Sequence, residues 1–178
     1  RAARAGAPLW RLVDFHPRLT ANERAGLEAA LEASGLLDAW LSADGALTDV
    51  TGQLLLDVHW TTRPPVAGPS LNDALVPSLP ENSPIAASLL TALLASVAWG
   101  REDPSDAESW ISSDGCFRLG ALSGAWRKPE ARYIGHTARE RARQQRLQEI
   151  AAAIGALDVA DAALAQQFHT LKADRDQA

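Results

Sequence analysis

The stretch LQEIAAAIGALDVADAALAQQFHTL, residues 147–171, decides how this chain is organised. Its large apolar residues recur at alternating steps of three and four residues. The one exception is Asp161, which occupies a position where the series calls for an apolar residue. Alternating steps of three and four residues are the spacing of the a and d positions of a coiled coil, in which one helix lies along another. The stretch therefore predicts a long C-terminal helix that pairs with a second helix. We call its large apolar positions the seam: Leu147, Ile150, Ile154, Leu157, Leu164, Phe168 and Leu171.

A helix that could pair with the seam is not found elsewhere in the sequence. Residues 1–7 are rich in alanine and arginine and permit a helix, but Pro8 ends it. The sequence also has no methionine, and so no start residue. We therefore expect an excised piece of a longer protein. In this interpretation residues 1–7 end an incoming coiled-coil arm, residues 8–135 form a globular body, and residues 136–178 start an outgoing arm.

The composition is that of an ordinary folded domain. Of 178 residues, 47% are hydrophobic and 22% are charged. No run of about 18 apolar residues occurs, so the sequence predicts no membrane span. Cys116 is the single cysteine, which excludes an intramolecular disulfide and a cysteine-rich metal site. A lone cysteine fits a reducing compartment, and we expect a cytoplasmic location.

The first half of the body contains one strong helix signal. Thr20 and Glu23 form a capping-box pattern, which predicts a helix that runs to about Ala33. Gly35 then lies where a helix commonly ends. The inward face of this helix is expected to carry Leu27, Ala30 and Leu31. The outward face is expected to carry Glu23, Glu28 and Glu32.

The remaining segments predict an α+β fold, a compact body of mixed helices and strands with a long C-terminal coiled-coil helix. The proline-rich stretch at 63–70 predicts a linker, which leaves open a body of two lobes, 8–62 and 83–135. Gly135 is expected to turn the chain into the long helix. The other expected strands are 9–15, 53–62, 110–111, 116–122 and 131–134, and the other expected helices are 36–41, 71–76 and 85–96.

Basic residues gather in one segment of an otherwise acidic chain. The net charge is −5, yet residues 118–146 hold eight arginines and lysines against two glutamates. Such a density suits phosphate contacts, and because no base-reading motif accompanies it, DNA binding would be independent of sequence. Alternatively, these residues form a solvated flank that pairs with acidic residues of the missing arm. The candidate DNA-binding residues are Arg127, Lys128, Arg132, Arg139, Arg143 and Arg146.

The sequence gives little support to catalysis or to a bound cofactor. Asp57 and His59 would share one face of a strand, but no nucleophile is placed beside them. No glycine-rich phosphate loop is present. We expect no catalytic residue, no metal and no cofactor in this chain. The histidines are scattered without metal-ligand spacing: His16, His59, His136 and His169.

Three segments resemble the central region of large bacterial SMC-like ATPases. They are PLWRLVDF (8–15), ERAGLEAALEASGLLDAWL (23–41) and DGCFRLGALSGAWRKPEARYIG (114–135), and an arginine-rich coiled coil follows them directly. Within that group the chain is similar to the JetC-type subunit of Wadjet plasmid-defence systems, a relative of MukB and MksB. The resemblance covers nearly the whole sequence.

This resemblance implies the hinge of a condensin-like ATPase complex, which homodimerises and joins two arms far from the ATPase heads. Such complexes extrude DNA loops with ATP, and in Wadjet a nuclease subunit then cleaves circular plasmid. Because this chain has no GxxxxGK[ST] loop, ATP binding would lie in heads outside it. The implied partners are a second copy through the body, the coiled-coil arm of the same full-length chain, and DNA. Kleisin and nuclease subunits are not expected to contact this region.

Two other functions remain open. The first is a stand-alone DNA-binding module dimerised by its coiled coil, because 20–33, Gly35 and the next segment superficially resemble a helix-turn-helix. The second segment, LLDAWL, is apolar and acidic, which suits a major groove poorly. The other alternative, an enzyme domain, would need a polar cleft. Most tryptophans are expected in the core, with one or two at a dimer interface: Trp10, Trp40, Trp60, Trp99, Trp110 and Trp126.

Overall fold

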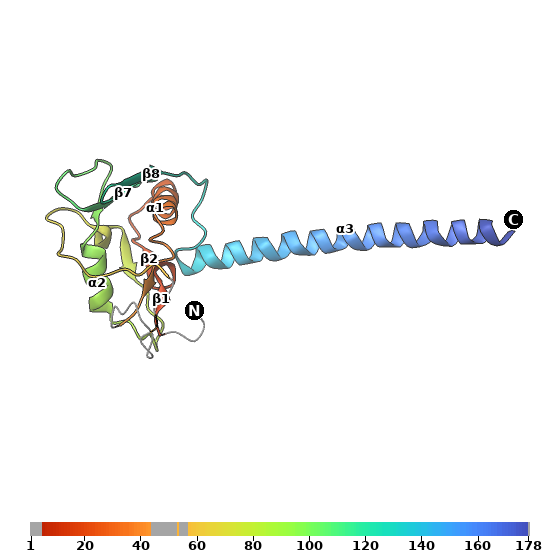
Figure 1. Cartoon of the computed structure of the whole chain (residues 1–178), viewed down its shortest axis with the longest axis horizontal. Coiled ribbons are helices and arrows are strands. Elements are labelled where there is room, and N and C mark those ends of the chain that lie inside the picture. Colours follow the sequence, from red (N-terminus) through yellow and green to blue (C-terminus); the bar gives the residue numbers. More distant parts are fainter. Residues whose placement is uncertain (1–4, 44–52, 54–56, 178) are drawn as a thin grey trace. The chain divides into compact units, whose positions relative to one another are not determined.

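The computed structural model describes residues 5–43, 53 and 57–177 and, within the C-terminal helix, the side chains of 143–168, 171–172 and 175. The fold class is α+β, as predicted, and the chain ends in the helix α3 (His136–Gln177) (Figure 1). Two compact units divide at Arg139: the body, Arg1–Arg139, and the rest of α3, Glu140–Ala178. Gly135 precedes α3 with a φ of +88°, so it turns the chain there as the sequence predicts.

The helix α1 (Ala21–Ala33) begins with the predicted capping box. The Thr20 hydroxyl accepts a hydrogen bond from the Glu23 amide at 3.3 Å, and the Glu23 carboxylate accepts one from the Thr20 amide at 2.9 Å. All residues from 25 to 31 are buried, so α1 is covered on every side over these turns. The prediction that Glu28 faces outward is therefore wrong, because its side chain is 0% exposed.

Replacing Thr20 by alanine is expected to lower the free energy of unfolding by about 1 kcal/mol near pH 7. Hydrogen bonds from the Thr20 amide and hydroxyl lower the pKa of Glu23. The pKa of Glu23 is lower in the folded than in the unfolded protein. The hydrogen bonds to its carboxylate therefore stabilise the fold fully above the ordinary glutamate pKa of about 4.3, and this contribution is lost as pH falls through the folded pKa. Urea unfolding at about pH 7 and about pH 3 should show the difference between variant and parent shrinking in acid. An equal difference at both pH values would contradict a role for the carboxylate charge.

Two short antiparallel strand pairs brace the N-terminal part of the body. β1 (Ala7–Pro8) pairs with β3 (Trp40–Leu41), and β2 (Val13–Phe15) pairs with β4 (Leu75–Pro77). The 3₁₀ helix η1 (Leu9–Arg11) connects β1 to β2. These ladders join segments that are distant in the sequence. Such short strand pairs are marginally stable by themselves and depend on packing within the body.

These pairings correct three predictions. The helix expected at 36–41 is absent, since a turn after α1 leads into β3. Ala7 lies in a ladder opposite Leu41, so the described end of 1–7 is not the helical end of an arm. In 53–62, the described residues form only an isolated parallel bridge between His59 and Trp40, while 44–52 and 54–56 lie outside the described residues.

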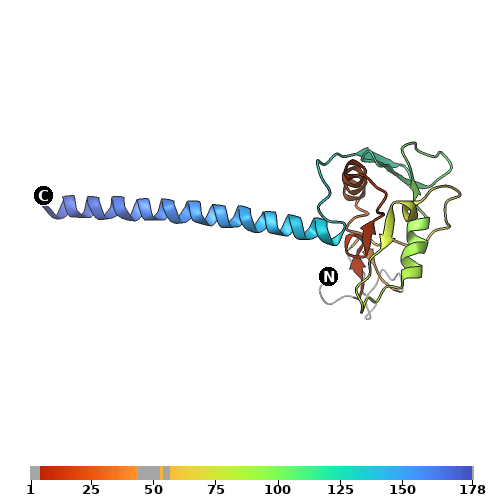
Figure 2. The same ribbon diagram turned by 180° about the vertical axis from the view of Figure 1, so that it is seen from behind.

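The second half of the body is built on a four-stranded sheet with the order β5-β6-β7-β8. β5 (Ala98–Trp99) runs parallel to β6 (Ser109–Ile111), and β6, β7 (Cys116–Leu119) and β8 (Leu122–Ala125) follow as an antiparallel meander. β7 and β8 lie beside α1 in both views (Figures 1 and 2). The predicted hairpin is confirmed, with one more strand than expected, whereas 131–134 forms no strand.

The helix α2 (Ala87–Ala95) confirms the predicted apolar helix, and the 3₁₀ helix η2 (Leu71–Asp73) replaces the helix expected at 71–76. The proline-rich stretch 63–70 lies along α2 and β5. Within it the Val66 amide donates to the Ala95 carbonyl, and the Pro69 carbonyl accepts from the Trp99 amide, each at 2.9 Å. The stretch is therefore a packed edge of the body and not a free linker.

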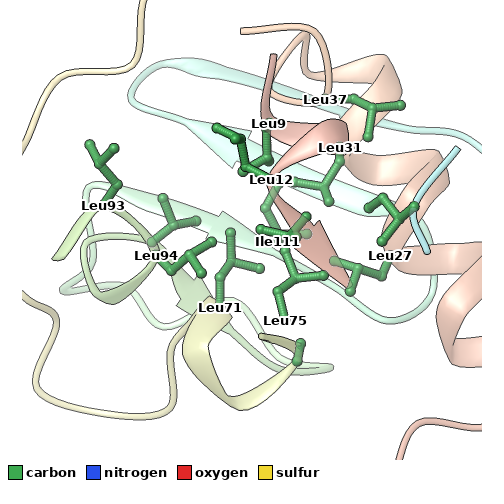
Figure 3. Packing of buried hydrophobic residues seen from close by; sticks show 14 of the residues in the cluster. Leu9, Leu12, Leu27, Leu31, Leu37, Leu71, Leu75, Leu93, Leu94 and Ile111 are labelled. Carbon is green, nitrogen blue, oxygen red and sulfur yellow. The ribbon is translucent and has the colours of Figure 1, made fainter. Parts of the chain in front are cut away.

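One hydrophobic core fills the body. It draws side chains from both of the predicted lobes, so the two-lobe alternative is wrong and the body is a single unit. A continuous core of this kind buries leucines of α1 against residues more than 40 positions away in sequence. Figure 3 shows its central members: Leu9, Leu12, Leu27, Leu31, Leu37, Leu71, Leu75, Leu93, Leu94 and Ile111.

Candidate functional site

The seam lies on a continuous helix and is open to solvent. All seven of its side chains are between 43% and 69% exposed, although each is large and apolar. α3 continues without a break through Gly155 and through Asp161, the polar residue in the series. A helix whose apolar stripe is uncovered gains little stability from packing, which is the main source of helix stability in proteins. The seam is therefore a surface suited to a partner helix.

The segment that leads into α3 is held by one buried carboxylate. Glu28, in the middle of α1, accepts hydrogen bonds from the backbone amides of Arg132, Tyr133 and Ile134 at 2.6, 2.8 and 2.8 Å. The Lys128 ammonium donates to the same carboxylate at 2.6 Å. We call Glu28, Lys128 and the three amides the Glu28 anchor. It satisfies a charge that would be costly to bury alone.

Lys128 remains charged because its partners outweigh its burial. Burial opposes its charge, but hydrogen bonds to Glu28 and to Glu32, the latter at 2.8 Å, raise the pKa of Lys128 above its ordinary value. The ammonium also lies 4.5 Å from the centre of the Tyr133 ring. Its stabilising contribution is complete below the ordinary lysine pKa of about 10.4 and is lost only as pH rises through the folded value.

The Glu28 anchor replaces the strand that we expected at 131–134. The amides of this segment bond to a side chain and not to a neighbouring strand. Sequence reasoning missed Glu28 because the apolar stripe of Leu27, Ala30 and Leu31 placed it on the outer face of α1. The nearest signal was the run of small residues around it, AGLEAA (25–30), which lets other segments approach α1 from all sides.

The structure separates the predicted DNA-binding residues. Lys128 is corrected to a structural residue, because its side chain is only 10% exposed and it binds two carboxylates. The Arg132 side chain is half exposed, and its Nε lies 3.3 Å from the carboxylate oxygen Oε1 of Glu130. Arg127 is exposed on the body, and the side chain of Arg139 lies outside the described residues. On α3, Arg143 is exposed and Arg146 lies 3.1 Å from Glu149. The exposed set is Arg127, Arg132, Arg143 and Arg146.

The tryptophans divide as expected between core and surface. Trp40, Trp60 and Trp110 are buried, and Trp10 and Trp99 are partly buried. Trp126, directly after β8, is 56% exposed. An exposed tryptophan on an otherwise ordinary surface is a typical feature of contact sites between proteins.

A hollow of about 860 Å³ on the body lies between 63–69 and the loop that follows β5. Its lining includes Arg63, Glu102 and Asp106. The one serine in it, Ser96, donates its hydroxyl to the Leu93 carbonyl at 2.7 Å, so the serine is not poised beside a base. Across the described residues, no group of three or more histidine, cysteine or acidic side chains is placed to hold a metal ion.

Three comparisons, with protein-family models, with curated proteins and with solved structures, each found no match to this chain. In the part of the chain that the structure describes, the helices are too short or too polar to cross a lipid bilayer.

Proposed function

We propose that this chain is the homodimerisation hinge of an SMC-like, DNA-loop-extruding ATPase that acts in the cytoplasm in plasmid defence. In this role the body holds two copies together, and α3 is the first part of an arm that leads toward ATPase heads outside this chain. The chain itself performs no catalysis and needs no cofactor. Its contact with DNA is weak and independent of sequence.

The exposed seam is the observation that carries this proposal. Burying one leucine, isoleucine or phenylalanine side chain contributes about 1.5–3 kcal/mol, so seven such residues on one stripe favour a paired state strongly. A helix of 42 residues exceeds the average helix of a globular protein several-fold, which suits an arm. The Glu28 anchor supports the same role, since it ties the segment before α3 to the most buried helix of the body.

Sedimentation equilibrium of the whole chain tests the proposal. The informative variant combines Leu157→Lys with Leu164→Lys, which places charges in the seam; we call it the seam variant. A hinge predicts that both the parent and the seam variant are dimers, because the body dimerises by itself. A dimer that the seam variant loses would favour the alternative of a DNA-binding module joined by its coiled coil. A monomeric parent would contradict the hinge.

DNA binding is expected to depend on the four exposed arginines of the basic segment 118–146. Replacing Arg127, Arg132, Arg143 and Arg146 together by alanine should weaken binding to a random duplex at least tenfold at low salt. The slope of log affinity against log salt should fall by about 1 for each arginine that contacts a phosphate. Fluorescence anisotropy with labelled duplexes of two unrelated sequences measures both quantities. Arg63→Ala, which removes an exposed arginine outside this segment, is the control and should change little.

The contrary results are equally clear for this DNA prediction. Unchanged binding by the fourfold variant would assign these arginines to the solvated flank of the coiled coil. A strong preference for one of the two sequences would favour base reading, and thus the stand-alone DNA-binding module.

A further inference from the structure

The two edges of the four-stranded sheet differ. At one edge, β5 is covered: the Trp99 amide donates to the Pro69 carbonyl, and Ser70 forms an antiparallel bridge with Ala98. At the other edge, all four residues of β8 are exposed. Within the described residues, no strand pairs with the outer side of β8. An open edge of this kind presents unpaired amides and carbonyls to another strand.

The open edge lacks the charged residues and the proline that commonly keep such edges from pairing. From 120 to 126 the sequence is GALSGAW, which contains no charged residue and no proline. Natural proteins commonly place lysine, proline or a bulge at an exposed edge strand to prevent association. The large side chains at its two ends, Leu122 and Trp126, are 61% and 56% exposed. An apolar, uncharged edge indicates that β8 is covered in the working state of the protein.

The exposed apolar side chains of the body gather at the same place. Four large hydrophobic side chains of the described body are exposed, and Leu122, Trp126 and Tyr133 lie in β8 or in the segment after it. Only Val58 lies elsewhere. This grouping favours one contact surface over scattered apolar residues, which are normal on any protein.

The arrangement along β8 is suited to a second copy of the same strand. Side chains alternate along a strand, so Leu122, Gly124 and Trp126 lie on one face. Gly124 is opposite Phe117, whose ring covers the position that a side chain at 124 would take. Two antiparallel copies related by a two-fold axis at Gly124 would bring Leu122 of each copy beside Trp126 of the other. Both apolar contacts would then form twice, as an isologous interface requires.

We propose that β8 pairs antiparallel with β8 of a second copy, joining two four-stranded sheets into one sheet across a two-fold axis. This inference rests on the proposed function, since it names the surface through which the body dimerises. A strongly charged partner is disfavoured because the β8 edge carries no charge that could attract it. A four-residue edge is short, so the interface belongs to the small class and its dissociation constant is expected in the micromolar range.

The test uses the whole chain carrying the seam variant, so that only the body can associate. Adding Leu122→Glu and Trp126→Glu should raise the dissociation constant of the dimer at least tenfold in sedimentation equilibrium, because the two-fold axis would bring like charges together. Val58→Glu is the matched control, since Val58 is also 61% exposed, and it should leave the constant unchanged. Equal constants for the two variants would overturn the β8 interface while leaving a dimeric hinge intact.

Hydrogen exchange of the seam variant alone gives a second readout that needs no change in β8. The Trp126 amide already donates to the Gly115 carbonyl, so by alternation along the strand the amides of Ser123 and Ala125 are the ones that face the open edge. These two amides should become at least tenfold more protected as the concentration rises through the dissociation constant. Exchange of these amides at one rate in monomer and dimer would overturn the proposal, even if the glutamate variants fail to fold. If the seam variant stays monomeric at every concentration, the proposed hinge function fails, and the β8 interface fails with it.

Discussion

Replacing Glu28 by alanine is expected to lower the free energy of unfolding by about 3–5 kcal/mol, which is a large share of the stability of a domain this size. The change leaves the Lys128 ammonium with Glu32 alone and removes the acceptor of three backbone amides. An unpaired buried polar group costs about 1–3 kcal/mol, so several such losses add to a severe effect. Chemical denaturation followed by tryptophan fluorescence measures the free energy.

Two further variants separate the parts of the Glu28 anchor. Glu28→Gln keeps an acceptor oxygen but loses the charge, so it should fall between the parent and the alanine variant. Glu32→Gln is the matched control: Glu32 binds the same ammonium at 2.8 Å, but its side chain is 41% exposed. An exposed pair contributes about 0–1 kcal/mol. Equal losses for the alanine variant at 28 and for Glu32→Gln would contradict the anchor.

Adding a methyl group at two helical glycines is expected to have opposite effects. At Gly26 in α1, a Cβ atom would overlap the carbonyl of Ser113, which is backbone and cannot move aside. At Gly155 in α3, a Cβ atom would meet nothing within 4 Å. Gly26→Ala should therefore destabilise the body by more than the 1–3 kcal/mol typical of overpacking. Gly155→Ala should stabilise α3 by about 1 kcal/mol.

Thermal unfolding followed by circular dichroism tests both glycine variants, since the body and α3 are separate compact units and are expected to unfold in separate transitions. Gly26→Ala is expected to lower the midpoint of the body and to leave the helical signal of α3 in place. Gly155→Ala is expected to raise the helical content without moving the body transition. A stabilising Gly26→Ala would mean that α1 does not pack tightly against the segment around Ser113.

Features that depend on neighbouring positions in the sequence were predictable. The capping box joins Thr20 to a residue three positions later, and the seam repeats within single turns of α3, so both could be seen without a tertiary structure. The hairpin around Asp114 is likewise local. In each case the relative placement of the residues follows from secondary structure alone.

Features that depend on distant partners were not predictable. Glu28 is buried because Lys128 and the amides of 132–134 reach it from about 100 positions away, a pairing that no spacing in the sequence indicates. The segment at 36–41 has good helix formers, yet residues 40–41 form a ladder with 7–8. Tertiary contacts overrode the expected exposure in the first case and local helix propensity in the second. Which tryptophan is exposed depended on the same contacts.

Hydrogen exchange of α3 tests the central claim most directly. The central claim is that the seam has no partner helix within a single molecule. In a dilute, monomeric sample the amides of 147–171 should therefore exchange far faster than those of the buried turns of α1. Helix without tertiary cover opens readily, whereas core amides exchange only through larger unfolding. Protection of 147–171 as strong as that of α1 in a monomer would contradict the claim, because the seam would then already be buried within a single molecule.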